Sequence, residues 1–204
     1  MLGISDYGAF CAAIVLFLAL PGPGTFALLT STGKGGFRAG AAATFGVIAG
    51  DQVLLWLAVG GVAALLAAHP LAFRLVQYGG AAYLAWMGFR LLIAKTGAVA
   101  SPVRIEPRHY ARQAFLITLL NPKAIVFYMA FFPLFIDTAA HRGAVTFGAM
   151  AATIALITAG YCLSLCAFAG AVAVKVRAHR RLVRWLERLA GLFLVGFGVR
   201  LIRD

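Results

Sequence analysis

Long apolar runs alternate with short polar segments along the whole chain. A membrane-spanning helix needs about 20 predominantly apolar residues, and these runs reach that length. The pattern therefore predicts about six membrane-spanning helices, with a loop at residues 31–39 between the first two. The predicted spans are residues 7–30, 40–67, 71–94, 113–136, 144–174 and 185–202. The sixth span has the shortest apolar core, because Glu187 and Arg188 lie inside it.

The longest hydrophilic segment, residues 95–112, divides the chain into two halves. Residues 1–94 and residues 113–204 each contain three predicted spans, and because three is odd the halves enter the membrane from opposite sides. Basic residues gather in the loops after the first, third and fifth spans, so the positive-inside rule makes these loops cytoplasmic. The sequence predicts an all-α integral membrane protein of six transmembrane helices in two inverted three-helix repeats, joined by a basic cytoplasmic linker.

The first span of each half is interrupted near its middle. The interruption is Pro21-Gly22-Pro23-Gly24 in the first half and Asn121-Pro122-Lys123 in the second. Proline and glycine both disfavour the interior of a helix. Matched interruptions in inverted halves indicate a transporter site, because irregular backbone at that depth must be buried in protein or line a cavity. A pair of ordinary proline kinks is the alternative interpretation.

Asp51 and Lys123 are the two ionisable residues that lie well inside predicted spans. A charge in the bilayer interior is costly, and such residues usually pair with one another or mark a path for substrate or protons. Two interpretations stay open. Either Asp51 and Lys123 form a structural ion pair, or Asp51 takes up a proton or a cationic group during transport.

The residues around the second interruption are typical of a helix start. Asparagine is favoured at the N-cap and proline at the first helical position. Asn121 and Pro122 therefore predict a half-helix whose positive end faces an anion. Lys123 adds a formal positive charge at the same place, and Gly24 is a candidate start for an equivalent half-helix. Helix starts for a carboxylate, with Asp51 for an ammonium group, suit a zwitterionic amino acid.

Two further groups of residues concern packing and the lining of a cavity. Gly46 and Gly50 have the spacing of a small-residue pair, which lets another helix approach closely. Hydroxyl residues in the second half are candidates for lining a cavity, although hydroxyls also bond helix to helix in membranes. They are Tyr128, Thr153, Thr158, Tyr161 and Ser164.

Composition agrees with a membrane protein and argues against other classes. Apolar residues make up 63% of the chain and charged residues 12%, which is far from the balance of a soluble domain. The net charge of +12 does not indicate nucleic-acid binding, because the basic residues fall in loops and at span ends. Cys11, Cys162 and Cys166 are odd in number and lie in apolar runs, so no disulfide framework is expected. Residues 1–6 contain no Lys or Arg, so no cleaved signal peptide is expected.

The chain resembles the LysE/RhtB family of amino-acid exporters in the order and spacing of four elements. They are Pro21-Gly22-Pro23, residues 46–51, Gly80-Ala81-Ala82-Tyr83-Leu84 and Leu120-Asn121-Pro122-Lys123-Ala124. The resemblance covers nearly the whole chain. It implies secondary active efflux of amino acids such as lysine, homoserine, threonine or leucine from the bacterial cytoplasm, driven by an ion gradient. The family usually has asparagine after Pro-Gly-Pro, whereas this chain has Gly24, so a side-chain hydrogen-bonding group is absent there.

Two other functions are alternatives. Export of an inorganic cation would need several carboxylate, His or Cys side chains converging within the spans, and Asp51 is the one carboxylate well inside a span. Membrane thiol–disulfide chemistry would need a facing pair of reactive thiolates, whereas Cys162 and Cys166 lie four residues apart on one helix face. A hydrolytic enzyme is not supported, since no nucleophile, His and acid come together at depth.

The sequence as a whole predicts a multi-pass transporter of the bacterial inner membrane that exports amino acids by proton antiport. Its expected partners are the amino acid, H⁺ and the lipid bilayer, without nucleic acid, cofactor or bound metal, and a homo-oligomer is compatible with the pattern. Asp51 and Lys123 are predicted to couple transport to protons or to form an ion pair. The predicted substrate site consists of Pro21, Gly22, Pro23, Gly24, Asn121, Pro122 and Lys123.

Overall fold

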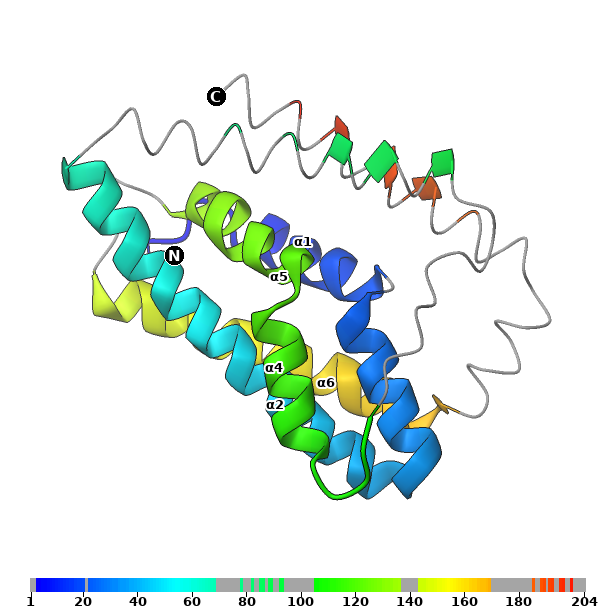
Figure 1. Ribbon diagram of the computed structural model, residues 1–204. Helices are drawn as coiled ribbons and strands as arrows, with labels where there is room; N and C mark the ends of the chain where they lie inside the picture. Colours follow the sequence, from blue (N-terminus) through cyan, green and yellow to red (C-terminus); the bar gives the residue numbers. More distant parts are fainter. Residues whose placement is uncertain are drawn as a thin grey trace.

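The computed structural model describes residues 3–20, 22–68, 105–136 and 143–169, with isolated residues between 78 and 93 and between 185 and 199. All elements of this described part are helices or helical turns, and its one β-pairing is an isolated bridge between Ile4 and Ile136. Pro21 and most of the predicted third and sixth spans lie outside it. Figure 1 shows the elements, which are α1 (Tyr7–Ala19), α2 (Pro23–Ala68), α4 (Tyr110–Leu119), α5 (Pro122–Val126), the π-helical turn η1 (Phe127–Phe131), the 3₁₀ turn η2 (Phe132–Phe135) and α6 (Ala144–Ala167).

The first break lies where the sequence predicts it. α1 ends at Ala19 and α2 begins at Pro23, with Leu20 in an extended conformation (ψ 116°) after α1. At the other end of α1, Oδ1 of Asp6 accepts a hydrogen bond from the amide of Ala9 at 2.9 Å, as N-cap residues do. Because α1 stops at the break, its last carbonyl groups lose their partners within the helix.

The predicted loop at residues 31–39 is wrong in extent. The helix bends only at Gly35 (φ −134°, ψ 17°) and Gly36 (φ 68°, ψ −168°). Glycine adopts a positive φ without the steric cost that other residues meet, so two glycines suffice for the bend. In Figure 1 the chain turns back on itself at this point. α2 therefore consists of two arms, residues 23–34 and residues 37–68.

The second break also lies where the sequence predicts it. α4 ends at Leu119 and α5 begins at Pro122. The predicted capping is confirmed, because Asn121 is the N-cap and its Oδ1 accepts a hydrogen bond from the amide of Lys123 at 3.1 Å. α5 passes directly into η1 and η2, and π-helical turns occur frequently at functional sites.

The helix at the fourth predicted span begins before residue 113, the predicted start of that span. α4 begins at Tyr110, inside the segment 95–112 that the sequence assigns to the linker. The loop before α4 is closed by Gln113, whose Oε1 accepts from the amide of Glu106 at 2.8 Å and whose Nε2 donates to its carbonyl at 2.9 Å. The first turn of this helix is polar, so an apolar pattern does not reveal it.

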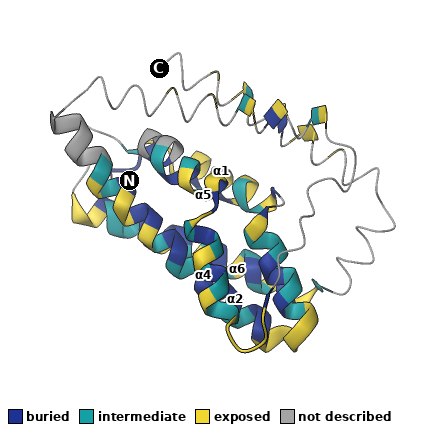
Figure 2. Ribbon diagram, viewed as in Figure 1, coloured by how far each residue is buried: buried dark blue, intermediate teal, exposed yellow. Residues whose placement is uncertain are grey.

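α2 packs against both α4 and α6. A Cβ atom added to Gly46 would fall on the carbonyl of Ala111, and one added to Gly50 would lie 2.8 Å from Cβ of Thr118. The close helix approach predicted for this glycine pair is therefore confirmed, and the partner is α4. Figure 2 shows that buried residues concentrate where α2, α4 and α6 meet, whereas the bend of α2 is exposed.

Replacing Gly46 with alanine should destabilise the protein. The new methyl group would overlap the backbone of Ala111, which moves only if α4 moves, and overpacking of this kind is destabilising. We expect the melting temperature in detergent to fall by about 5 °C or more. Gly60→Ala is the control in the same helix, since nothing lies within 4 Å of an added Cβ there. Equal melting temperatures of the two variants would contradict the close packing.

Two stretches of the described helices are long and apolar enough to cross a membrane. They are Pro23–Gly61, within α2, and α6, while α1 is a shorter apolar helix. A Cβ on Gly88 would lie 2.6 Å from the carbonyl oxygen of Gly191 and 2.8 Å from Cγ2 of Val195. The predicted third and sixth spans therefore pack closely at this point. The arrangement of six spans in two inverted repeats stays a prediction.

Candidate functional site

A cavity of about 50 Å³ lies at the two breaks, lined by residues of α1, α2, α4, α5, η1 and α6. Its apolar walls include Phe17, Leu18, Leu28, Val47 and Ile154. Its polar or ionisable lining residues are Thr25, Asp51, Thr118, Asn121, Lys123, Tyr128, Thr158, Tyr161 and Cys162. The cavity is thus shared by both predicted halves of the chain, and it combines apolar walls with a small set of polar groups.

Lys123 connects the second break to the first. Its side chain is only 8% exposed, and its Nζ donates a hydrogen bond of 2.7 Å to the carbonyl of Leu20, where α1 has ended. Nζ also lies 4.3 Å from the centre of the Phe17 ring, a distance at which a cation is attracted by the face of an aromatic ring. An ammonium group carries three donor hydrogens, so the bond to Leu20 leaves donor capacity for other groups in the cavity.

Asp51 lines the same cavity from the second arm of α2. Its carboxylate is 7% exposed, accepts a hydrogen bond from the hydroxyl of Tyr128 and interacts electrostatically with Lys123. Nε2 of the neighbouring Gln52 donates to the carbonyl of Ala151 at 3.1 Å, which fixes this part of α2 against α6. One buried acidic residue and one buried basic residue therefore lie at the same site.

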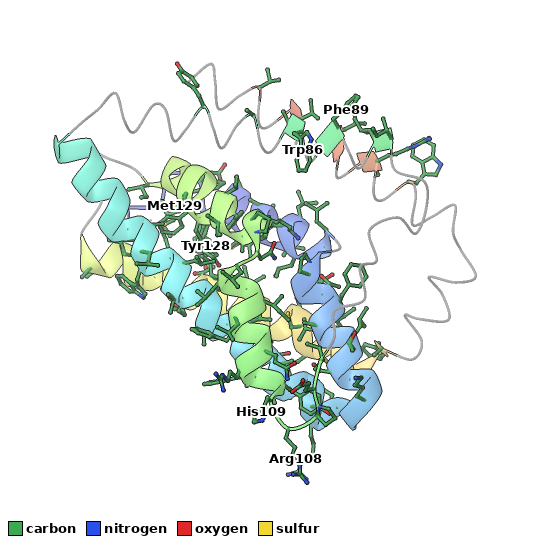
Figure 3. The ribbon with its side chains drawn as sticks, in the orientation of Figure 1. Trp86, Phe89, Arg108, His109, Tyr128 and Met129 are labelled. Carbon is green, nitrogen blue, oxygen red and sulfur yellow. The ribbon has the colours of Figure 1, made fainter. Side chains whose placement is uncertain are left out.

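Figure 3 shows that Tyr128 of this site lies apart from the polar loop before α4. Tyr128, on η1, lies toward the middle of the molecule, whereas Arg108 and His109 project from the loop at its far end. Arg108 and His109 are both exposed. The loop is thus kept apart from Tyr128, which bonds to Asp51 at the cavity.

Most of the predicted site residues come together at the cavity. They are Gly22, Gly24, Asp51, Asn121 and Lys123. Pro23 and Pro122 are exposed and are absent from the lining. Each is the first residue of its helix, so the prolines fix where α2 and α5 begin. Pro21 lies outside the described residues.

The hydroxyl candidates divide into two groups. Those that line the cavity are Tyr128, Thr158 and Tyr161. Thr153 and Ser164 do not line it, and Oγ1 of Thr153 instead pairs with the hydroxyl of Tyr7 at 3.0 Å, bonding α6 to α1. Phe17 lines the cavity but is not among the predicted site residues. Its position three residues before Leu20 places it on the face where α1 ends, and this spacing is the signal that identifies it.

Gly24 lines the cavity without contributing a side chain. A Cβ atom at this position would have no atom within 4 Å. The departure from the Pro-Gly-Pro-Asn pattern that the resemblance implies therefore leaves open space beside the break. The polar groups on the other walls must supply any side-chain hydrogen bonds made there.

The described residues contain no group of three or more His, Cys, Asp or Glu side chains that is placed to hold a metal ion. Cys11, Cys162 and Cys166 carry free thiols, and Cys162 and Cys166 are buried. Sγ of Cys166 lies so near Gly40 that an added Cβ there would come within 2.7 Å of it. Small-residue packing thus accounts for Cys166.

Two broken helices that meet at a shared cavity are typical of one class of helical membrane proteins, the secondary transporters with discontinuous helices. Residues 15–204 match the family model described as LysE type translocator. The chain belongs to this family, which confirms the resemblance observed in the sequence.

Several curated relatives are similar to the chain over nearly its full length. A leucine efflux protein of Klebsiella pneumoniae subsp. pneumoniae is 34% identical over 206 residues, covering 98% of this chain and 95% of the relative. Leucine efflux proteins of Salmonella typhimurium and of Enterobacter sp. are 35% and 36% identical, again over 98% of this chain and over 95% and 96% of their own. These relatives are named as efflux proteins and not as enzymes. No solved structure matches the chain significantly.

Proposed function

We propose that this protein is a secondary active transporter of the bacterial inner membrane that exports amino acids from the cytoplasm by proton antiport. The observation that carries the proposal is the cavity at the two breaks, which holds one buried carboxylate, Asp51, and one buried ammonium, Lys123. An amino acid is itself a zwitterion, with its ammonium and carboxylate groups attached to the same carbon atom. Membership of the LysE family and the relatives named as leucine efflux proteins support the same function.

The two charges assign an orientation to the substrate. Lys123 receives the carboxylate, next to the capping residue Asn121, because its ammonium keeps donor capacity beyond the bond to Leu20. Asp51 receives the α-ammonium group, and the apolar walls receive the side chain. Among the described lining residues Asp51 is the one carboxylate, so a second amino group on the substrate would lack a partner. We therefore expect neutral aliphatic amino acids such as leucine to be preferred over lysine.

Transport requires the cavity to change its size. Pockets for small molecules enclose about 300–1,000 Å³, against about 50 Å³ here, so the described conformation is expected to be a closed one. The bond from Lys123 to Leu20 joins the two broken spans, and the bond from Tyr128 to Asp51 joins η1 to α2. These are the contacts expected to alter when the site opens to either side of the membrane.

Asp51 is the proposed coupling group. A carboxylate is neutralised either by the ammonium group of the substrate or by a proton, and both compete for the same charge. A site that carries the amino acid outward and a proton inward therefore exchanges one for the other. Because the exchange depends on competition at one carboxylate, it needs no further titratable group at this depth.

The proposal is tested with purified protein in liposomes preloaded with a mixture of labelled amino acids. Acid outside the liposomes should accelerate the loss of one or a few species, with leucine among them and lysine absent, relative to liposomes at equal pH. Failure to release any amino acid, with the protein shown to be folded and inserted, would contradict the proposal. Release of a divalent cation from liposomes preloaded with that cation would then support the alternative function, metal efflux.

A further inference from the structure

Two buried side-chain oxygens in the described part of the chain have no hydrogen-bond partner, Oγ of Ser31 and Oγ1 of Thr158. Burying an unpaired hydroxyl costs free energy, because its hydrogen bonds to water are not replaced. Such a group in a native structure needs an explanation. Of the two residues only Thr158 lines the cavity. A molecule bound there could therefore supply a hydrogen-bond partner to Thr158 but not to Ser31.

Thr158 differs from three other threonines in the helices. The hydroxyls of Thr32, Thr44 and Thr153 each donate to the carbonyl four residues earlier, at 2.8, 3.0 and 2.8 Å. This local bond is the usual way in which a helix satisfies a threonine. Thr158 lies well inside α6, is 1% exposed and makes no such bond. Its hydroxyl therefore has no hydrogen-bond partner within the protein, although the residue lines the cavity.

Other polar groups at the cavity are engaged by the protein itself. Lys123 donates to the carbonyl of Leu20, Asp51 accepts from Tyr128, and Oδ1 of Asn121 accepts from the amide of Lys123. A bound substrate shares these groups with their protein partners. A hydrogen bond from the substrate to Thr158 would displace no protein partner, because the hydroxyl has none in the protein.

The cavity face of α6 lies on the side of the cavity that contains Asp51. Asp51 interacts electrostatically with the thiol of Cys162, and Cys162 follows Thr158 by one helical turn on the same face. Gln52, next to Asp51, is bonded to the carbonyl of Ala151 in the same helix. A hydroxyl on the carboxylate side of a site suits an ammonium group that the carboxylate attracts, because the ammonium donates hydrogen bonds and the hydroxyl oxygen accepts them.

We infer that Thr158 is a substrate-binding residue whose Oγ1 accepts a hydrogen bond from the α-ammonium group of the transported amino acid, beside Asp51. This inference rests on the proposed function and adds a specificity-determining residue to it. A carboxylate attracts an ammonium group from many directions, whereas a hydroxyl in a fixed position forms its hydrogen bond in one direction only. A site built to form that hydrogen bond rejects molecules that have the carboxylate and the aliphatic chain but lack the amino group.

The test compares binding of labelled leucine to the purified full-length protein and to three variants. Thr158→Val removes the hydroxyl at nearly constant volume and should weaken leucine binding about tenfold, the lower end of the effect of one hydrogen bond to a charged group. Thr158→Ser keeps the hydroxyl and should bind within about twofold of the wild type. Ser31→Ala removes the other unpaired hydroxyl, away from the cavity, and should bind as the wild type does. Wild-type affinity of Thr158→Val for leucine would overturn the inference.

The partner on the substrate is identified with 4-methylpentanoate, which has the shape of leucine without its amino group. Thr158→Val should bind this acid as well as the wild type does, so discrimination between the two ligands should fall about tenfold. An equal loss of affinity for both ligands would overturn the assignment to the ammonium group.

The melting temperature without ligand distinguishes a binding role of Thr158 from a structural one. A structural role predicts a lower melting temperature for Thr158→Val. Removing an unpaired buried hydroxyl should leave the melting temperature unchanged or raise it, whereas Thr153→Val, which loses its bonds to Ala149 and Tyr7, should lower it. A fall for Thr158→Val as large as that for Thr153→Val would overturn the inference. Failure of the wild type to bind any amino acid would instead refute the proposed function.

Discussion

Replacing Asp51 with asparagine is expected to abolish the acceleration of leucine efflux by a pH gradient while leaving the protein folded. Asparagine keeps the size of the side chain and an oxygen that accepts a hydrogen bond from Tyr128, but it does not exchange a proton near neutral pH. In one-for-one exchange, a gradient of one pH unit supplies about 1.4 kcal/mol, or a tenfold ratio of substrate across the membrane. The wild type should approach this ratio in liposomes, and the variant should show none of it.

Asp6→Asn is the matched control for this substitution. It also removes one carboxylate, but at the N-cap of α1, where asparagine serves about as well as aspartate. This control should keep the full response to the gradient, and both variants should elute from size-exclusion chromatography as the wild type does. Normal gradient-driven efflux by the Asp51 variant would remove Asp51 from the coupling step and leave the structural ion pair with Lys123 as its interpretation.

The breaks and caps of the fold could be predicted from the sequence because their causes are local. Proline and glycine interrupt a helix wherever they occur, and Asn121 caps the helix that Pro122 begins. The predicted loop at residues 31–39 contains the bend of α2, but the extent of the bend could not be predicted, since the polar residues around Gly35 and Gly36 are as compatible with a loop as with a helix. Thr32 illustrates the reason, because its hydroxyl bonds to the carbonyl of Leu28 and so is satisfied inside the helix.

The candidate site was predictable only in part. Asp51 and Lys123 share a cavity, as expected for two ionisable residues that the sequence places inside predicted spans, because charges at bilayer depth are driven into the protein interior. The bond from Lys123 to the carbonyl of Leu20 joins a side chain to the backbone. Because every residue has a backbone carbonyl, the sequence does not indicate which one accepts this bond. Thr153 and Thr158 are five residues apart in a helix of 3.6 residues per turn, so they point in different directions. Which of them faces the cavity depends on the rotation of α6 about its axis, and the packing of α6 against α1 and α2 sets that rotation.

Replacing Lys123 with methionine is expected to destabilise the protein by about 3–5 kcal/mol, because Asp51 is then buried without its opposite charge. Methionine keeps most of the apolar stem and removes the ammonium that bonds to Leu20 and lies over the ring of Phe17. In a chain of this size, the loss corresponds to a fall in melting temperature of about 6–20 °C. Thermal unfolding in detergent, followed by tryptophan fluorescence, measures it directly.

Lys34→Met separates the loss of a hydrogen bond from the loss of a buried charge. Nζ of Lys34 also donates to a backbone carbonyl, that of Ile105 at 2.8 Å, but from an exposed position at the bend of α2, so its loss should cost only about 1 kcal/mol. The double variant Asp51→Asn/Lys123→Met should be more stable than Lys123→Met alone, since it removes both charges, and the double-mutant cycle measures their coupling. Equal melting temperatures of Lys123→Met and Lys34→Met would mean that Lys123 does not neutralise Asp51. The assignment of the two charges to opposite ends of a zwitterion would then lack its electrostatic basis.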